Sequence, residues 1–178
     1  TINRGDKQDK KMFMQLGPIR HRYTAKERAQ KQGIGHYIYP RFTRLVDLNQ
    51  SEDRNPADYY RLIMQSELRN MQIVSDTIDC VKRGRTPVVM TKYKEHAQKL
   101  YDMLQGAADH VFLLQGGKSL KERSAIREQM AAVRADESII LVAIGQYVGE
   151  GFNYPRLDTM LLAMPISFEG NVEQHAGR

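Results

Sequence analysis

Four continuous apolar runs in the second half of the chain constrain its fold more than any other feature of the sequence. They cover residues 88–90, 111–114, 139–144 and 160–164, and none of them alternates apolar with polar side chains. Continuous runs are typical of parallel strands that helices cover on both faces, whereas alternation marks a strand with one face in water. The runs therefore predict a mainly parallel, open α/β sheet from about Asn55 onward.

The segments around these runs predict helices. Apolar residues repeat at helical spacing over 97–104 and again over 126–133, and Ser119 with Glu122 has the capping-box spacing of a helix start. Gly84 predicts the end of a helix that comes before the first strand. The alternation of strand and helix predicts right-handed crossovers between parallel neighbours.

The beginning of the chain differs in composition from the rest. Residues 20–24 and 36–39 read as short strands on either side of a helix over 25–32, and residues 47–54 are polar and linker-like. Asn55, followed by a proline, predicts a helix start with the asparagine as the cap. The predicted parts are a lead-in and an α/β domain, residues 1–54 and 55–178.

Composition limits the classes of protein to which the chain can belong. A length of 178 residues suits one domain with an appendage, and no apolar run approaches the ~20 residues that a membrane span needs. The single cysteine, Cys80, excludes an internal disulfide and suits a reducing compartment. We therefore expect a cytoplasmic protein in which Cys80 is a small apolar residue on a helix. The net charge of +6 and the pI of 9.4 favour a polyanionic partner.

Ligand sites in an open α/β sheet lie beyond the carboxyl ends of the strands. These positions hold mostly small or polar residues here, which suits a ligand-binding edge. Turns between strands and helices favour the same residue types, so the pattern alone also admits a purely structural interpretation. The positions are Thr91, Lys92, Gln115, Gly116, Gly117, Gly145, Gln146 and residues 165–167.

Two segments near the end of the chain carry residues suited to chemistry. The loop over 145–155 has three glycines, which permit tight turns and close backbone approach to a ligand. Within it, Glu150 supplies an acceptor and Asn153 both a donor and an acceptor. Further on, Gln174 and Arg178 lie one helical turn apart on the same face of a predicted helix. Taken singly, these segments also fit a flexible loop and an exposed surface arginine.

Four segments resemble motifs of superfamily 2 helicases. The loop 145–155 is similar to motif V, in which a Glu-Gly-x-Asp-x-Pro pattern follows an apolar strand, and residues 174–178 resemble the start of motif VI, Gln-x-x-Gly-Arg. Residues 88–100 resemble motif IV, and residues 114–117 the motif that follows it. The segments occur in the family's order across residues 87–178. The chain thus resembles the C-terminal RecA-like domain of bacterial and phage DNA translocases and repair helicases of the DEAD/DEAH type.

The resemblance implies a set of ligands and contacts. It implies ATP and Mg²⁺ as cofactors, nucleic acid as a partner with DNA favoured over RNA, and a first RecA-like domain of the same protein as a second partner. The Mg²⁺ ligands would lie on that first domain, with no metal ligand in this chain. The implied contacts to ATP are Gly149, Glu150, Gly151, Asn153, Gln174, Gly177 and the catalytic Arg178. The implied contacts to nucleic acid are Thr91, Lys92, Gln115, Gly116, Gly117, Gly145 and Gln146.

Departures from the family pattern limit these implications. Asn153 stands where many relatives have an aspartate, and the chain ends before the second arginine of motif VI. The chain also has neither a Gly-x-x-x-x-Gly-Lys-Ser/Thr loop nor an Asp-Glu pair after an apolar strand. Because it begins with Thr1 in a polar stretch, we expect a piece of a longer protein. Residues 36–43 resemble the segment that joins the two RecA-like domains in bacterial relatives, which implies that the piece starts after motif III. By itself this piece should not hydrolyse ATP.

Two other interpretations stay open. A non-catalytic nucleic-acid-binding module with a vestigial ATP site would also carry altered motif residues such as Asn153. A Rossmann-type nucleotide-binding enzyme domain shares the strand and helix pattern, but it needs a Gly-x-Gly-x-x-Gly loop after its first strand. This chain has Thr-Lys-Tyr-Lys there, at residues 91–94. Motifs I and II in a longer sequence would distinguish an ATPase from a binding module.

Overall fold

The structure is a computed structural model, which describes residues 9–18, 20, 27, 31, 33, 35, 37–43, 45, 55–115, 120–145 and 154–165. The chain divides into two compact units, residues 1–41 with 166–178 and residues 42–165. The second unit contains the whole sheet. The domain boundary predicted at residues 47–54 falls outside the described residues and stays a prediction.

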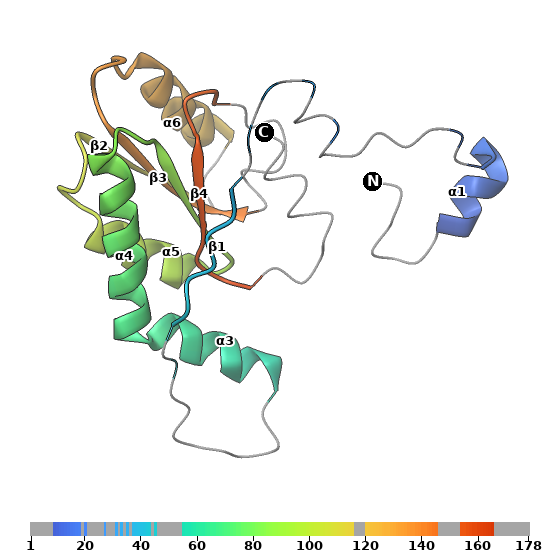
Figure 1. Cartoon of the computed structure of the whole chain (residues 1–178), viewed down its shortest axis with the longest axis horizontal. Helices are drawn as coiled ribbons and strands as arrows, with labels where there is room; N and C mark the ends of the chain where they lie inside the picture. The colour runs from blue at the N-terminus through green and yellow to red at the C-terminus, as the bar shows by residue number, and fades with distance from the viewer. Residues whose placement is uncertain are drawn as a thin grey trace. The chain divides into compact units, whose positions relative to one another are not determined.

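Four parallel strands form one sheet, and each corresponds to one of the apolar runs (Figure 1). Their order across the sheet is β2-β3-β1-β4, with β1 paired to both β3 and β4. The mainly parallel α/β sheet predicted from the runs is therefore confirmed. The strands are β1 (Pro87–Thr91), β2 (His110–Leu114), β3 (Ile139–Ile144) and β4 (Thr159–Leu162).

Helices cover both faces of this sheet, as the continuous runs predict. The helices are α3 (Pro56–Gln65), α4 (Glu67–Lys82), α5 (Lys94–Met103) and α6 (Leu120–Ala132). Ile140 and Val142 of β3 pack in one core with residues of α4 and α5, whereas Leu141 and Ala143 pack in a second core with α6. Because successive side chains of a strand point to opposite faces, β3 has to be apolar at every position.

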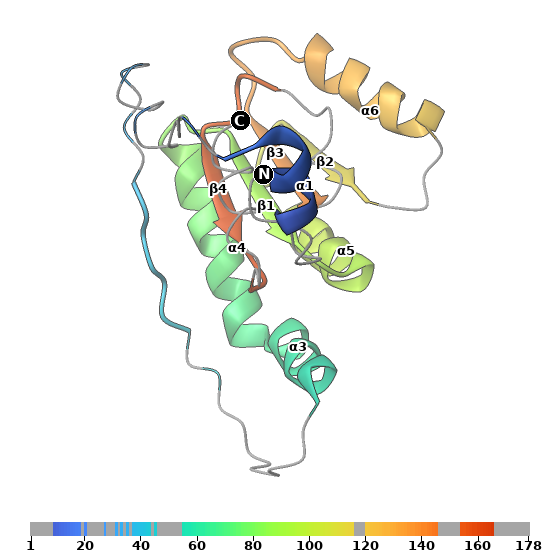
Figure 2. The same ribbon diagram turned by 90° about the vertical axis from the view of Figure 1, so that its right-hand side faces the viewer.

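The helix boundaries follow the predicted local signals. Asn55 caps α3, since its side-chain oxygen accepts hydrogen bonds from the backbone N–H groups of Ala57 at 2.8 Å and Asp58 at 3.2 Å. Gly84 has a φ of +71° directly after α4, a backbone conformation that glycine adopts without strain. The chain bends between α3 and α4 at Ser66 (Figure 2). Ser119, the predicted cap of α6, lies outside the described residues.

The lead-in agrees less well with prediction. A helix, α1 (Asp9–Leu16), was not predicted. The predicted strand over 36–39 is wrong, because Tyr37, Ile38 and Tyr39 form no strand and their side chains are exposed. Aromatic and β-branched residues favour strands only where a neighbouring strand can pair with them. Residues 27 and 31 are helical, as predicted for the segment that contains them.

Candidate functional site

The register of the sheet brings the described members of the predicted nucleic-acid set to one edge. Thr91 is paired with Ile144, and Leu114 with Ala143. Since the strands are parallel, the residues that follow them, Lys92, Gln115 and Gly145, emerge at the same end of the sheet. We call this end the carboxyl edge. Gly116, Gly117 and Gln146 lie outside the described residues.

A buried chain of hydrogen bonds holds the carboxyl end of β1. Nδ2 of Asn70 donates to the carbonyl of Met64 at 2.8 Å, which leaves Oδ1 of Asn70 facing Nε2 of His96 at 3.0 Å. Nδ1 of His96 lies 2.8 Å from the hydroxyl of Thr91. Because an amide oxygen can only accept, we infer that Nε2 carries the proton and that Nδ1 accepts from the hydroxyl.

This chain of hydrogen bonds determines what each residue at the end of β1 can do. Asn70, His96 and Thr91 are all buried, so each hydrogen bond replaces one that water would otherwise make. The hydroxyl of Thr91 faces inward and already has a partner. Lys92 is exposed, and it carries the side chain that a ligand at this strand end would meet.

The electrostatic setting keeps His96 neutral. Burial, helped by the nearby positive charges of Arg69 and Lys99, lowers the pKa of His96 from 6.5 to about 4. A neutral imidazole is what the hydrogen-bond chain requires, because one ring nitrogen donates and the other accepts. His96 and Asn70 were not singled out as site residues from the sequence. A histidine at a helix start gives no signal of burial.

Lys92 lies among aromatic rings. Its ammonium is 4.6 Å from the ring centre of Tyr60 and 5.7 Å from that of Tyr93, distances at which a cation is attracted to a ring face. The two ring centres are 5.8 Å apart, with the planes inclined at 54°. Tyr60 belongs to α3 and Tyr93 to the turn after β1, so the cluster joins two elements. The sequence does not single out Tyr60 as a site residue.

Two polar groups are buried without a hydrogen-bond partner among the described residues. They are Oε1 of Gln115, at the carboxyl edge, and Nη1 of Arg69 on α4. Burial also lowers the pKa of Arg69. An unpaired buried polar group costs about 1–3 kcal/mol, so the burial of Oε1 of Gln115 at the carboxyl edge is unfavourable.

The opposite end of the sheet, the amino edge, anchors the chain after the glycine loop. The Tyr154 hydroxyl donates to the carbonyl of Met130 at 2.9 Å. The Arg156 guanidinium donates to carbonyls in the turn between α6 and β3, at 3.0 Å to Arg134 and 2.7 Å to Glu137. The chain therefore leaves the carboxyl edge at Gly145 and is fixed again at the amino edge.

The predicted contacts to the nucleotide stay predictions. Gly149, Glu150, Gly151, Asn153, Gln174, Gly177 and Arg178 all lie outside the described residues. Within the ranges that the structure describes, no group of three or more His, Cys, Asp or Glu side chains could hold a metal ion. No helix in those same ranges is long and apolar enough to cross a membrane.

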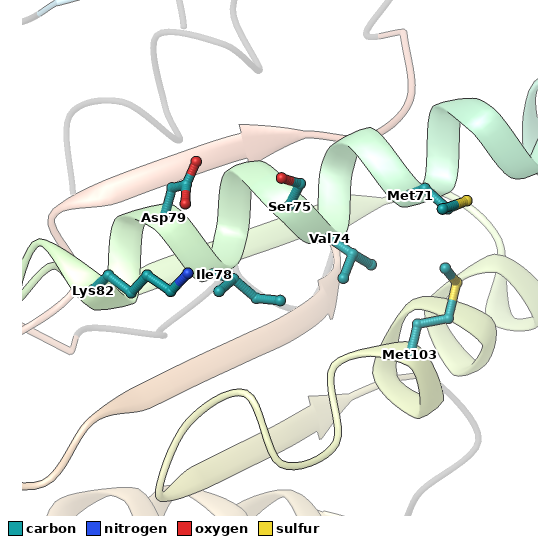
Figure 3. Close-up of a pocket in the computed structure, with 7 residues that line it drawn as sticks. All are labelled: Met71, Val74, Ser75, Ile78, Asp79, Lys82 and Met103. Carbon is teal, nitrogen blue, oxygen red and sulfur yellow. The ribbon is translucent and has the colours of Figure 1, made fainter.

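An open groove of about 280 Å³ lies between α4 and α5, away from these positions (Figure 3). Met71 and Met103 lie at one end of it and Lys82 with Asp79 at the other. The predicted ligand-binding residues are not among those that line it. The lining residues are Met71, Val74, Ser75, Ile78, Asp79, Lys82 and Met103.

Comparisons with known proteins bear on the fold and on the family. No family model matches the chain. The chain is 27% identical over 136 residues to transcript termination protein A18 of fowlpox virus (strain NVSL), a match that covers 72% of this chain and 28% of that protein. The chain thus spans between a quarter and a third of the length of this relative.

Solved structures of two other proteins resemble this chain. The crystal structure of T4 UvsW matches with a TM-score of 0.58 and 18% identity over 70% of this chain and 25% of that chain. The C-terminal part of the Fun30 ATPase domain matches with a TM-score of 0.49 and 17% identity over 64% of this chain and 36% of that chain. The match to T4 UvsW shows a shared fold, and the RecA-like α/β arrangement predicted from sequence is confirmed.

Proposed function

We propose that the chain is the second RecA-like domain of a superfamily 2 DNA helicase or translocase, and that its carboxyl edge contacts the nucleic-acid backbone. The observation that carries the proposal is the placement of exposed Lys92 at the same end of one parallel sheet as Gln115 and Gly145. The order of the four motif-like segments supports it. The likeness to a protein named for transcript termination supports a role on nucleic acid.

In this proposal the residues at the edge bind backbone and leave base sequence unread. The Lys92 ammonium is a compact charge that meets a phosphate oxygen without geometric selection. The Gln115 carboxamide offers hydrogen bonds to phosphate or sugar. Thr91, His96 and Asn70 act behind them, because their buried hydrogen bonds fix the end of the strand from which Lys92 extends.

The same proposal assigns the chain one side of an ATP site in the cytoplasm. The glycine loop, with Glu150 and Asn153, and the residues Gln174 and Gly177 would contact the nucleotide, and Mg²⁺ would be held by the first RecA-like domain. Bound ATP would supply the phosphoryl transfer that drives the domains along DNA. Arg178 would place its guanidinium near the γ-phosphate when the domains close.

Binding of single-stranded DNA tests the proposal that the carboxyl edge contacts nucleic acid. Lys92→Ala should weaken binding roughly threefold to tenfold at moderate salt and should lower the slope of log K against log salt by about 0.7, because one phosphate contact is lost. Fluorescence anisotropy measures both quantities. Lys82→Ala is a matched control, since Lys82 is exposed on α4 at the opposite end of the sheet. Equal losses in the two variants would show that binding is not centred on the carboxyl edge.

ATP turnover in a longer protein that also contains motifs I and II tests the proposal that this chain forms one side of an ATP site. Arg178→Ala should lower kcat by roughly 10³ while changing nucleotide affinity little, because an arginine finger stabilises the transition state more than the ground state. Arg178→Lys should not restore turnover, since lysine lacks the planar fork. A kcat within about twofold of the unmodified protein would remove Arg178 from the active site.

A further inference from the structure

We propose that Tyr60 and Tyr93 form a stacking platform for an unpaired base of single-stranded nucleic acid, while Lys92 binds the neighbouring phosphate. The proposal rests on the proposed function, since it places the platform on the same carboxyl edge. It adds a contact to bases, where the edge otherwise contacts only the backbone.

The two rings are available at the surface. Tyr60 and Tyr93 are half-buried and Lys92 is exposed. The ring planes are inclined at 54°, so the rings do not cover each other's faces as a parallel stack would. Tyr59, the neighbour of Tyr60 on α3, is 48% exposed, so this part of the helix borders solvent.

The Lys92 ammonium is held over the rings by a weak interaction. A cation over a tyrosine face at an exposed site contributes far less than a charge-assisted contact to phosphate in a nucleic-acid complex. A phosphate can therefore draw the ammonium away from Tyr60, which leaves that ring face free. A base next to that phosphate can then take the place of the ammonium.

The chemistry of this cluster fits a single strand better than a duplex. Sites for single-stranded nucleic acid combine a positive group that follows the backbone with aromatic rings on which bases stack. Here the positive group is the Lys92 ammonium, and the centres of the Tyr60 and Tyr93 rings lie within 5.7 Å of it. Bases in a duplex are already stacked on each other and present no free face. The platform has no fixed hydrogen-bond pattern for a base edge, so it should tolerate any base sequence.

Two ligands of equal charge separate stacking from charge. One is a short oligothymidylate, and the other is an abasic phosphodiester oligomer of the same length. Tyr60→Ala in the 178-residue chain should weaken binding of oligothymidylate about tenfold and binding of the abasic oligomer by less than about twofold. Tyr60→Phe should behave like the unmodified chain, because the ring is retained. Tyr59→Ala, on the same helix, is the matched control and should leave both affinities unchanged.

A fluorescent variant gives a direct reading that does not depend on the alanine variant. The chain has no tryptophan, so Tyr60→Trp introduces a single indole. Oligothymidylate should quench this indole on binding, and the abasic oligomer should not. Equal losses of both ligands in Tyr60→Ala, or an indole that oligothymidylate leaves unquenched, would overturn the platform alone. An unmodified chain that binds neither ligand would overturn the proposed function as well.

Discussion

The two ends of the sheet use polar residues in different ways. At the amino edge, polar groups are paired within the chain: Arg156 donates to backbone carbonyls, Asp158 accepts from the backbone N–H of Thr86 at 3.0 Å, and Asp109 accepts from Ser138 at 2.7 Å. At the carboxyl edge, Lys92 is exposed and Gln115 has an acceptor without a partner among the described residues. Polar residues thus stabilise the fold at the amino edge, whereas at the carboxyl edge Lys92 is exposed to solvent.

The carboxyl edge also contains polar residues that are hydrogen-bonded within the chain, so the two edges differ only in part. His96 and its partners are as thoroughly hydrogen-bonded as the residues of the amino edge, but they are buried behind Lys92. At this end, the residues that we expect to stabilise the fold are therefore neighbours of the residues that we propose bind nucleic acid. Substitutions can separate the two roles, and the largest effect on stability is expected at His96.

His96→Ala should lower the free energy of unfolding by about 3–4 kcal/mol. The change leaves a cavity and removes the hydrogen-bond partners of the buried Thr91 and Asn70. Urea unfolding measures the loss. His110→Ala is the control, because His110 on β2 is partly exposed and should cost less than about 1 kcal/mol. Similar losses of unfolding free energy in both variants would contradict a special role for the buried hydrogen bonds of His96.

Acid should destabilise the protein through the same histidine. The pKa of His96 is about 4 in the folded chain, below its ordinary 6.5, so the unfolded chain binds the proton first as pH falls. The stabilising contribution of the neutral ring is complete above pH ~6.5 and is lost progressively down to pH ~4, a change of about 3 kcal/mol. Unfolding across this range should show the loss. His96→Gln cannot titrate, and an identical acid profile in that variant would assign the loss to other groups.

Arg156→Ala should have a smaller effect, about 2 kcal/mol on unfolding, because several charge-assisted hydrogen bonds to carbonyls at the amino edge are lost. Affinity for single-stranded DNA should stay within about twofold of the unmodified chain at a temperature where both are folded. Lys92→Ala should show the reverse, with affinity reduced and stability changed by less than about 0.5 kcal/mol. A variant of Arg156 that stays stable but loses DNA affinity would break the distinction between the two edges.

Much of the fold could be predicted because it depends on local and repeating features. The apolar runs identified the four strands of the sheet that the structure describes, and their continuity predicted helices on both faces. Asn55 and Gly84 marked helix ends through backbone geometry that few residues satisfy. The strand predicted over 36–39 failed because pairing depends on a neighbour, which residue preferences cannot supply.

The sequence by itself determined the α/β class, the strand positions and the polar residues at the strand ends, because periodicity and turn chemistry act over a few neighbouring residues. Only the tertiary structure decided which of those polar residues face inward. Thr91 and Lys92 are adjacent in the chain, yet one is buried against His96 and the other lies over Tyr60. The contact of Lys92 with Tyr60 and the hydrogen bond between Asn70 and His96 join residues that are far apart in sequence, and packing alone brings them together.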